Sequence, residues 1–175
     1  LVNFFRYIWG VSFMSKVRND WKLEEVLQLF NKSFNELLYQ AHDIHVKNHK
    51  KDMVQVCTLL SIKTGGCPED CGYCSQSIHS DDPIEATPLM SLEEVEKQAK
   101  LARDQGSTRF CMGAAWRRPS NKNIDRVIKM IDIVHDLGME SCVTLGMLSE
   151  DQAIRLSKSG LNYYNHNLDT SREHY

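Results

Sequence analysis

The sequence predicts an α/β fold built on parallel strands, of either the barrel or the doubly wound type. Short apolar runs rich in β-branched residues alternate with stretches in which apolar residues recur at helical spacing, and this cycle repeats over 54–164. Strands connected through helices in this way run parallel with right-handed crossovers. Chemically suggestive side chains follow the strand-like runs, as they do in barrels, where active groups gather at the carboxyl ends of the strands.

Two helices are expected before this repeating part, over 21–30 and 33–46, where apolar residues lie three and four positions apart. The first strand is expected over 54–62, a near-continuous apolar run that suits a strand buried on both faces. Cys57 lies inside this run. A single cysteine there is interpreted as a small buried hydrophobe without chemistry.

Three further cycles are marked by capping residues and terminal glycines. Ser91 and Glu94 have the spacing of a capping box, and Ser149 repeats that pattern with Gln152. The expected helices end near Gly106, Gly138 and Gly160, and the expected strands cover 108–112, 139–145 and 161–164. A complete eight-unit barrel takes about 250 residues, so four units indicate its amino-terminal half.

Three segments are expected: a leader of uncertain origin over 1–20, amino-terminal helices over 21–50 and the half barrel over 51–175. Because Met14 has the character of a start residue, residues 1–13 are interpreted as upstream or added sequence. A half barrel exposes sheet edges and an unfinished core. We therefore expect poor stability unless the chain dimerises or the parent protein continues past Tyr175.

Composition excludes several classes of function. A formal net charge of -2 gives no electrostatic footprint for nucleic acid. The apolar opening over 1–13 is interrupted by Arg6 and is too short to span a bilayer. Six cysteines without a secretory signal predict a reducing compartment, the cytoplasm or a mitochondrial matrix, and thiols that are free or metal-bound.

Cys67, Cys71 and Cys74 form a Cys-x-x-x-Cys-x-x-Cys run directly after the first expected strand. Three thiolates at this spacing can hold three irons of a cubane iron–sulfur cluster and leave the fourth iron open to a chelating small molecule. A structural zinc site is the alternative, with His79 as its fourth ligand. Zinc sites more often use two Cys-x-x-Cys pairs, and the chain has no second pair.

Three stretches carry a resemblance to a known family: TLLSIKTGGCPEDCGYC at 58–74, STRFCMGAAWR at 107–117 and YYNHNLDTS at 163–171. In this order they resemble the biotin synthases, a family of radical S-adenosylmethionine enzymes, and the similarity runs from about Leu23 to the last residue. The resemblance implies a TIM-type (β/α)8 barrel, of which about the first four units are present. It also implies a homodimer and an electron donor such as flavodoxin or ferredoxin.

The activity implied by the resemblance is that of a sulfurtransferase. It converts dethiobiotin to biotin, the last step of biotin biosynthesis, by radical sulfur insertion that uses 5'-deoxyadenosyl radicals made from S-adenosyl-L-methionine. Two clusters are implied, a 4Fe-4S cubane held by the three cysteines described above and a 2Fe-2S unit that donates sulfur. Cys111 and Cys142 match two ligands of the 2Fe-2S unit, and Arg109 matches its neighbour. The family's third cysteine and its arginine ligand lie in the second half of the barrel.

The resemblance also assigns residues to the cofactor and the substrate, and no acid or base catalyst. The cofactor-binding matches are Tyr73, Gly113, Ala114, Ala115, Asn167 and Asp169. The substrate-binding matches are Lys63, Asn165 and Asn167. Two alternatives remain open from the sequence: another radical S-adenosylmethionine enzyme without a sulfur-donor cluster, and a truncated chain that binds a cluster but is inactive.

Overall fold

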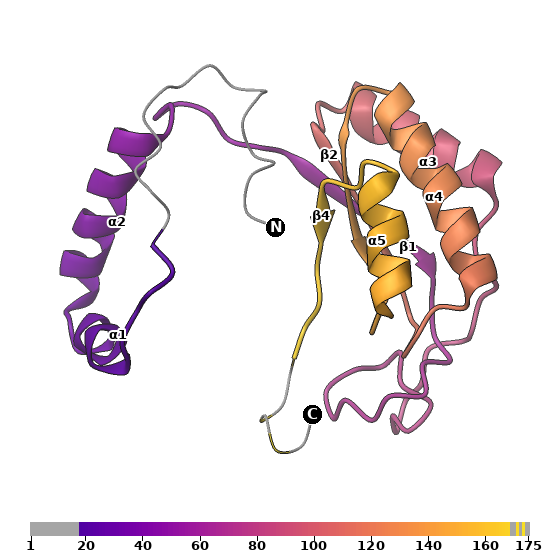
Figure 1. Ribbon diagram of the computed structural model, residues 1–175, viewed down its shortest axis with the longest axis horizontal. Coiled ribbons are helices and arrows are strands. Elements are labelled where there is room, and N and C mark those ends of the chain that lie inside the picture. The colour runs from indigo at the N-terminus through magenta and orange to yellow at the C-terminus, as the bar shows by residue number, and fades with distance from the viewer. Residues whose placement is uncertain (1–17, 169–170, 172, 174–175) are drawn as a thin grey trace. The chain divides into compact units, whose positions relative to one another are not determined.

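The computed structural model describes residues 18–168, 171 and 173 (Figure 1). Two compact units divide between Val54 and Gln55. Most of the expected leader lies outside the described residues, as does Asp169. Over the part of the chain that is described, no helix has both the length and the apolar character needed to cross a membrane.

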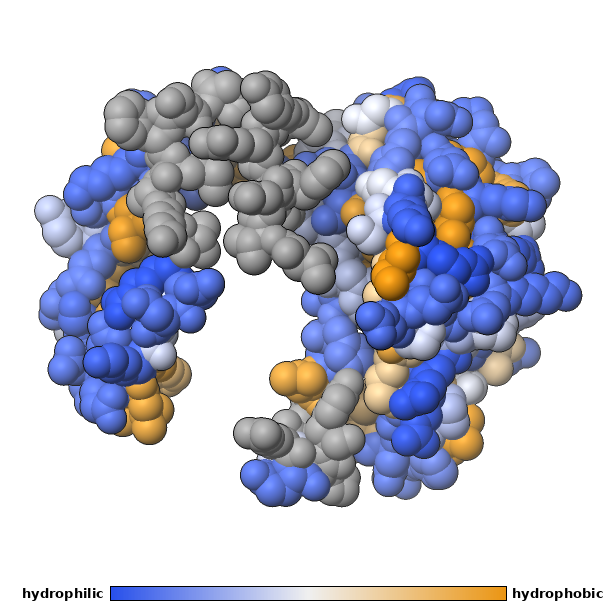
Figure 2. All heavy atoms as spheres, viewed as in Figure 1, coloured by the Kyte–Doolittle hydropathy of each residue, from blue (hydrophilic) through white to orange (hydrophobic). Residues whose placement is uncertain are grey.

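The first unit contains the two expected helices, α1 (Leu23–Phe30) and α2 (Phe34–Asn48). Ser33 caps α2, its Oγ accepting a hydrogen bond from the Glu36 amide at 3.4 Å. Both helices are described in full, and neither contains a buried residue. Phe30 and Phe34 are 81% and 75% exposed, and hydrophobic side chains are visible on the surface of this unit (Figure 2). The two helices therefore form no core of their own.

The second unit contains four strands of one parallel sheet, which alternate with three helices. Its elements are β1 (Cys57–Lys63), α3 (Leu92–Asp104), β2 (Arg109–Ala114), α4 (Asn121–Asp136), β3 (Glu140–Thr144), α5 (Glu150–Lys158) and β4 (Tyr163–Tyr164). The strand order is β1-β2-β3-β4, so the sheet winds in one direction without the reversal of a doubly wound fold. The α/β prediction is confirmed, and this winding is that of the first four units of a (β/α)8 barrel.

Serine caps begin the three helices of this unit. The Oγ atoms of Ser91, Ser120 and Ser149 accept hydrogen bonds from backbone amides three residues later, at 3.2, 3.2 and 3.3 Å. The Gln152 side chain also accepts from the Ser149 amide at 3.1 Å, which completes a capping box. Each cap satisfies an amide that the first helical turn leaves without a partner, and so fixes where the helix begins.

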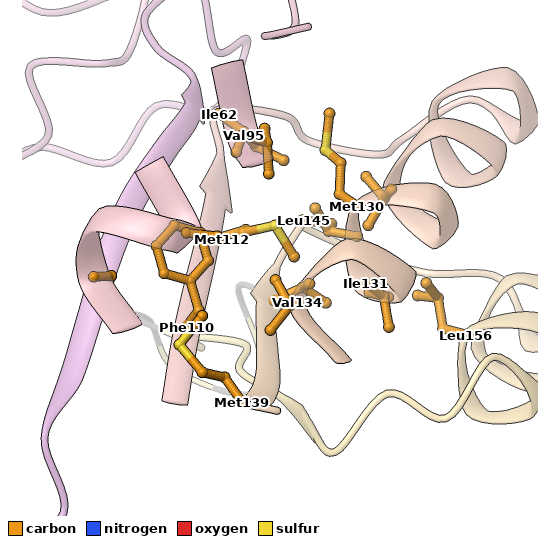
Figure 3. Packing of buried hydrophobic residues seen from close by; sticks show 14 of the residues in the cluster. Ile62, Val95, Phe110, Met112, Met130, Ile131, Val134, Met139, Leu145 and Leu156 are labelled. Atoms are coloured by element: carbon orange, nitrogen blue, oxygen red, sulfur yellow. The ribbon is translucent and has the colours of Figure 1, made fainter. Parts of the chain in front are cut away.

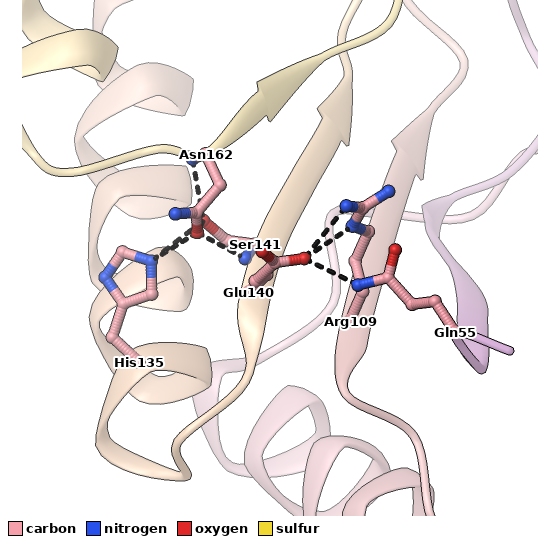
Figure 4. Close-up of polar contacts among 6 residues, drawn as sticks. All are labelled: Gln55, Arg109, His135, Glu140, Ser141 and Asn162. Atoms are coloured by element: carbon pink, nitrogen blue, oxygen red, sulfur yellow. Dashed lines mark hydrogen bonds and ion pairs between the residues drawn. The ribbon is translucent and has the colours of Figure 1, made fainter. Parts of the chain in front are cut away.

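The core lies between the sheet and the layer formed by α3, α4 and α5 (Figure 3). Alternate residues of β2 point into it, because successive side chains of a strand face opposite sides of the sheet. Phe110 and Met112 are fully buried there, against helix residues such as Val95, Val134 and Ile131. At the edge of this layer, the Asn162 side chain accepts a hydrogen bond from the Ser141 amide at 2.8 Å (Figure 4).

The opposite face of the sheet is open within the second unit. Cys57 is exposed and Leu59 is 72% exposed, while Cys111 and Cys142 are partly exposed. The prediction that the first strand is buried on both faces is wrong, and so is the interpretation of Cys57 as a buried hydrophobe. An apolar run shows that a strand belongs to a sheet, but which faces are covered depends on elements far away in the sequence.

Candidate functional site

The cysteine run lies in a loop after β1, and backbone hydrogen bonds hold its three cysteines together. The Cys67 amide donates to the Gln76 carbonyl at 2.9 Å, and the Cys67 carbonyl accepts from the Ile78 amide at 2.9 Å. The Cys74 amide donates to the Cys71 carbonyl at 2.9 Å, and Ser77 in turn donates to the Cys74 carbonyl at 3.1 Å. All three cysteines are therefore fixed to one short stretch of chain.

Buried polar contacts stabilise the inside of this loop. Ser77 is 2% exposed, and its Oγ donates to the Glu69 carbonyl at 2.5 Å while accepting from the His79 amide at 3.1 Å. The Gln76 side chain accepts from the Gly65 amide at 3.2 Å. These contacts join the start, middle and end of the loop, so its backbone is ordered by the protein itself.

Gly65 lets the loop return across its own beginning. Its φ is +65°, and a Cβ atom there would lie 2.5 Å from the Ile84 carbonyl oxygen and 2.7 Å from that of Glu85. Any other residue would be strained in this conformation and would also push the returning segment away. The Thr87 amide completes the closure by donating to the Thr64 carbonyl at 2.9 Å.

The donor set fits a cubane cluster better than a zinc ion. All six cysteines are described as thiols, and Cys67, Cys71 and Cys74 are partly exposed. Within the described ranges, no three His, Cys, Asp or Glu side chains are grouped to hold a single metal ion, and His79 is exposed. The thiolates of a cubane also surround one cluster, but each binds a different iron, so they lie further apart than the ligands of a single ion.

Cys111 and Cys142 form a second pair of thiols on the open face of the sheet. They are register partners on the neighbouring strands β2 and β3, and their side chains share a hydrogen bond. Burial raises the pKa of the Cys111 thiol to about 12, and the bond with Cys142 adds to the shift. Both residues lie in mid-strand, and because their strand neighbours Phe110, Met112 and Val143 are buried under the helices, the pair is on the opposite, open face of the sheet.

Cys57 is a residue of this face that the sequence analysis did not assign. It lies in register with Arg109 on the neighbouring strand. The available signal was the spacing within the parallel strands: Cys57 and Leu59 on β1 align with Arg109 and Cys111 on β2. A single strand does not reveal this alignment.

Glu140 and Gln55 hold the Arg109 side chain at the amino-terminal end of the sheet (Figure 4). Its Nε and Nη2 donate to Glu140 Oε2 at 3.0 and 2.9 Å, and the Gln55 amide nitrogen donates to the same oxygen at 2.7 Å. The guanidinium also lies 3.6 Å from the ring centre of Tyr163. Burial lowers the pKa of Arg109, but the hydrogen bonds with Glu140 and the nearby negative charge together outweigh burial, so the net shift is upward and the group keeps its charge.

Lys63 is the last residue of β1, and Gly113 lies near the carboxyl end of the neighbouring strand β2. Lys63 Nζ donates to the Gly65 carbonyl and, at 3.1 Å, to the Ala115 carbonyl. A Cβ atom on Gly113 would meet no atom closer than Leu59 Cδ1 at 3.9 Å. Packing within the chain therefore does not require glycine at 113. The free space beside its backbone suits a ligand that approaches closely.

The remaining predicted residues lie near the ends of β1, β2 and β4. Ala114 is partly buried and Ala115 is 8% exposed. Asn165 donates from its amide nitrogen to Thr144 Oγ1 at 3.2 Å and to Asn167 Oδ1 at 3.4 Å, so these two predicted residues are brought together. Tyr73 is 75% exposed on the cysteine loop.

A hollow of about 410 Å³ opens near the end of β4, where sequence reasoning identified no pocket. Arg118 and His166 contribute polar groups to it. Gly146 lines the same hollow with a φ of +82°, and the Trp116 carbonyl oxygen lies 2.3 Å from where its Cβ atom would be. The close approach of these two loops shapes the hollow, and nothing in the local sequence around 118 or 166 indicates it.

Comparison with known proteins agrees with this geometry. Residues 61–175 match the model of the radical SAM superfamily. The chain is 55% identical over 162 residues to a biotin synthase of Thioalkalivibrio sulfidiphilus, covering 93% of this chain and 48% of that protein. It is 57% identical over 162 residues to that of Ruthia magnifica, covering 93% and 50% of the two chains.

A biotin synthase of Novosphingobium aromaticivorans is 55% identical over 159 residues, which cover 91% of this chain and 45% of that protein. The chain thus spans about half the length of the curated relatives it matches. The superfamily match covers the cysteine loop and all the strands after β1. The chain belongs to the radical S-adenosylmethionine superfamily.

Proposed function

We propose that the protein to which this chain belongs is a biotin synthase, which converts dethiobiotin to biotin by two radical hydrogen abstractions and sulfur insertion. The observation that carries this proposal is the presence of two separate thiol groups in one barrel half. A hydrogen-bonded loop holds Cys67, Cys71 and Cys74, and the sheet itself presents Cys111 beside Cys142. The similarity to biotin synthases supports the same conclusion.

In this proposal the cysteine loop holds the 4Fe-4S cluster and the sheet pair holds part of a 2Fe-2S unit. When bound, the cubane supplies the electron that cleaves S-adenosyl-L-methionine to a 5'-deoxyadenosyl radical. The open backbone at Gly113 accommodates the methionine end of that cofactor, with Ala114 and Ala115 beside it. Tyr73 lies by the adenine, and Asn167 and Asp169 take the ribose hydroxyls, which an amide and a carboxylate suit.

The substrate assignments rest on the polar groups at the carboxyl end of the sheet. Asn165 offers amide donors and acceptors that match the ureido ring of dethiobiotin, and its contact with Asn167 places two amides side by side. Lys63 is assigned to the same site. Its bonds with the Gly65 and Ala115 carbonyls hold its ammonium group between the first two strands. A flavodoxin or ferredoxin donor and a homodimer complete the proposal.

The test is anaerobic reconstitution of the chain with iron and sulfide, followed by turnover with reductant and S-adenosyl-L-methionine. We expect 5'-deoxyadenosine and methionine to form, and their formation to be lost in Cys71→Ala. Addition of dethiobiotin should give biotin when the protein contains every ligand of the sulfur-donor unit. Arg103→Ala is a suitable control, because Arg103 lies on the exposed side of α3, away from both thiol groups.

Three outcomes separate the proposal from its alternatives. If the chain cleaves the cofactor but its acid-labile sulfide content accounts for one cubane and no more, the protein is a radical enzyme without a sulfur-donor unit. Cluster uptake without cofactor cleavage would indicate an inactive, cluster-binding chain. Uptake of zinc in place of iron would contradict the proposal altogether.

A further inference from the structure

Three histidines lie along α2 and its C-cap, and the proposed function uses none of them. His42, His45 and His49 are spaced three and four residues apart, so they follow one another along the same side of the helix. His45 is partly exposed, and the other two are exposed. Because α2 contains no buried residue, packing in a core does not account for these imidazoles.

The structure pairs the last two of these side chains. The rings of His45 and His49 stack with their centroids 5.4 Å apart and their planes 21° from parallel. His49 is the C-cap of α2, and its amide donates to the His45 carbonyl at 2.8 Å, which fixes the two residues one turn apart. The backbone therefore already holds the two rings together, so a ligand that binds both of them does not have to bring them into place.

The separation of the rings suits one metal ion held by both. Metal–nitrogen bonds are about 2.1 Å long, so two imidazoles on a single ion have their ring centroids roughly 5 Å apart. Two neutral nitrogen ligands favour nickel, copper or zinc, since magnesium and calcium prefer oxygen. Asp43, the carboxylate closest to the pair in sequence, forms an ion pair with Lys47 at 2.6 Å. Within the described residues no third His, Cys, Asp or Glu joins the two rings, so water fills the remaining coordination positions.

We propose that His45 and His49 bind a divalent ion of the nickel, copper or zinc class, which joins the last turn of α2 to its C-cap. Such a bridge stabilises the folded helix, because an unfolded segment does not hold the two rings one turn apart and so binds the ion more weakly. The bridge acts in a helix that no core stabilises. This inference is independent of the proposed function, since no cysteine takes part in it.

Nickel(II) and diethyl pyrocarbonate test the site in the intact chain. The reagent modifies free imidazole nitrogens, and mass spectrometry gives its rate at each histidine. With nickel in excess over the six cysteines, modification of His45 and His49 should slow, roughly fivefold or more, because the ion occupies the reactive nitrogens. His42 should be unaffected, and magnesium at the same concentration should protect none of the three. Since each ring is followed separately, nickel held by thiols elsewhere does not mask the result.

Two variants make the test specific to the pair. His49→Ala removes one ligand outside the helix, and His42→Ala is the matched control, because it removes an exposed histidine of α2 that is not in the stacked pair. His49→Ala should abolish the protection of His45, and His42→Ala should retain it. Nickel should also slow hydrogen exchange in the last turn of α2 in the unmodified chain but not in His49→Ala. Circular dichroism checks that both variants keep their helices.

Two results would overturn the inference and leave the proposed function intact. One is an equal rate of modification of His45 with and without nickel. The other is protection of His45 that persists in His49→Ala or is lost in His42→Ala, since either would mean that the stacked pair is not what binds the ion.

Discussion

At the scale of single residues, the raised pKa of Cys111 makes a direct prediction about reactivity. With a pKa of about 12, roughly one Cys111 thiol in a thousand is ionised at pH 9, and the thiolate is the nucleophile. We expect iodoacetamide to label Cys111 in the metal-free folded protein far more slowly than the exposed Cys57, as measured by mass spectrometry over time. In denaturant the two rates should become similar.

The variant Cys142→Ala provides the control for this labelling experiment. It removes the hydrogen bond that contributes to the shift, so labelling of Cys111 should become faster, although burial still slows it. Equal labelling of Cys111 and Cys57 in the folded protein would contradict the paired arrangement of the two sheet thiols.

Glu140 gives a second prediction at this scale. Its carboxylate accepts two hydrogen bonds from Arg109 and one from Gln55 in a partly buried setting. Glu140→Gln keeps the shape but removes the charge, so the free energy of unfolding should fall by about 1–2 kcal/mol in urea denaturation. Asp104→Asn is the comparison, since Asp104 pairs with Arg103 in solvent and its loss should cost less than about 0.5 kcal/mol.

The sequence predicted some of these residues well and missed others for a physical reason. The three-cysteine run could be identified because its ligands are close together in sequence and the loop carries its own hydrogen bonds. The neighbours of Cys57 and Glu140 were missed, because they depend on the register between strands. Register is set by pairing across the whole sheet, and no local pattern around either residue encodes it.

At the scale of elements, the loop after β1 depends on the close approach at Gly65. Gly65→Ala should destabilise the protein by about 2 kcal/mol or more, because the new Cβ atom meets the carbonyl oxygens of Ile84 and Glu85 as well as an unfavourable φ. Iron uptake by the cysteine loop should fall with it, measured as iron per chain after reconstitution.

Gly138→Ala is the matched control for this change. Gly138 has a similar φ of +76°, but no atom lies within 4 Å of where its Cβ atom would be. It should cost only the backbone strain, about 1 kcal/mol, and leave iron uptake unaltered. Equal effects of the two substitutions would mean that the returning segment does not press on Gly65 in solution.

Element boundaries show where sequence reasoning reaches its limit. The helices after β1 begin and end close to their expected positions because both signals act locally. Serines cap the starts, as Ser149 does with its full capping box, and glycines follow the ends. The first strand was expected over 54–62 and is found at Cys57–Lys63, because its register with β2 begins at Cys57 and Val56 contributes only its carbonyl, which accepts from the Thr108 and Arg109 amides. Pairing rather than composition decides where a strand starts.

At the scale of the whole molecule, the two units differ in how much they bury. The core of the second unit is filled by residues with almost no exposure, such as Phe110 and Ile131, whereas α1 and α2 contain no buried residue. Sequence periodicity predicted all of these helices equally well, since an amphipathic pattern is present in both units. The pattern shows which face is apolar, and it does not show what covers that face.

This difference predicts unequal protection against hydrogen exchange. Backbone amides are protected by packing that resists local opening, so amides of α4 should exchange only in large unfolding events, while those of α2 open with little cost. Exchange followed by mass spectrometry should show α2 fully exchanged at least a hundredfold sooner than α4. The comparison is internal, because the two helices have similar lengths of 15 and 16 residues. If exchange in α2 is slow and becomes faster on dilution, its apolar face is covered by a second copy of the chain, because protection through association depends on concentration.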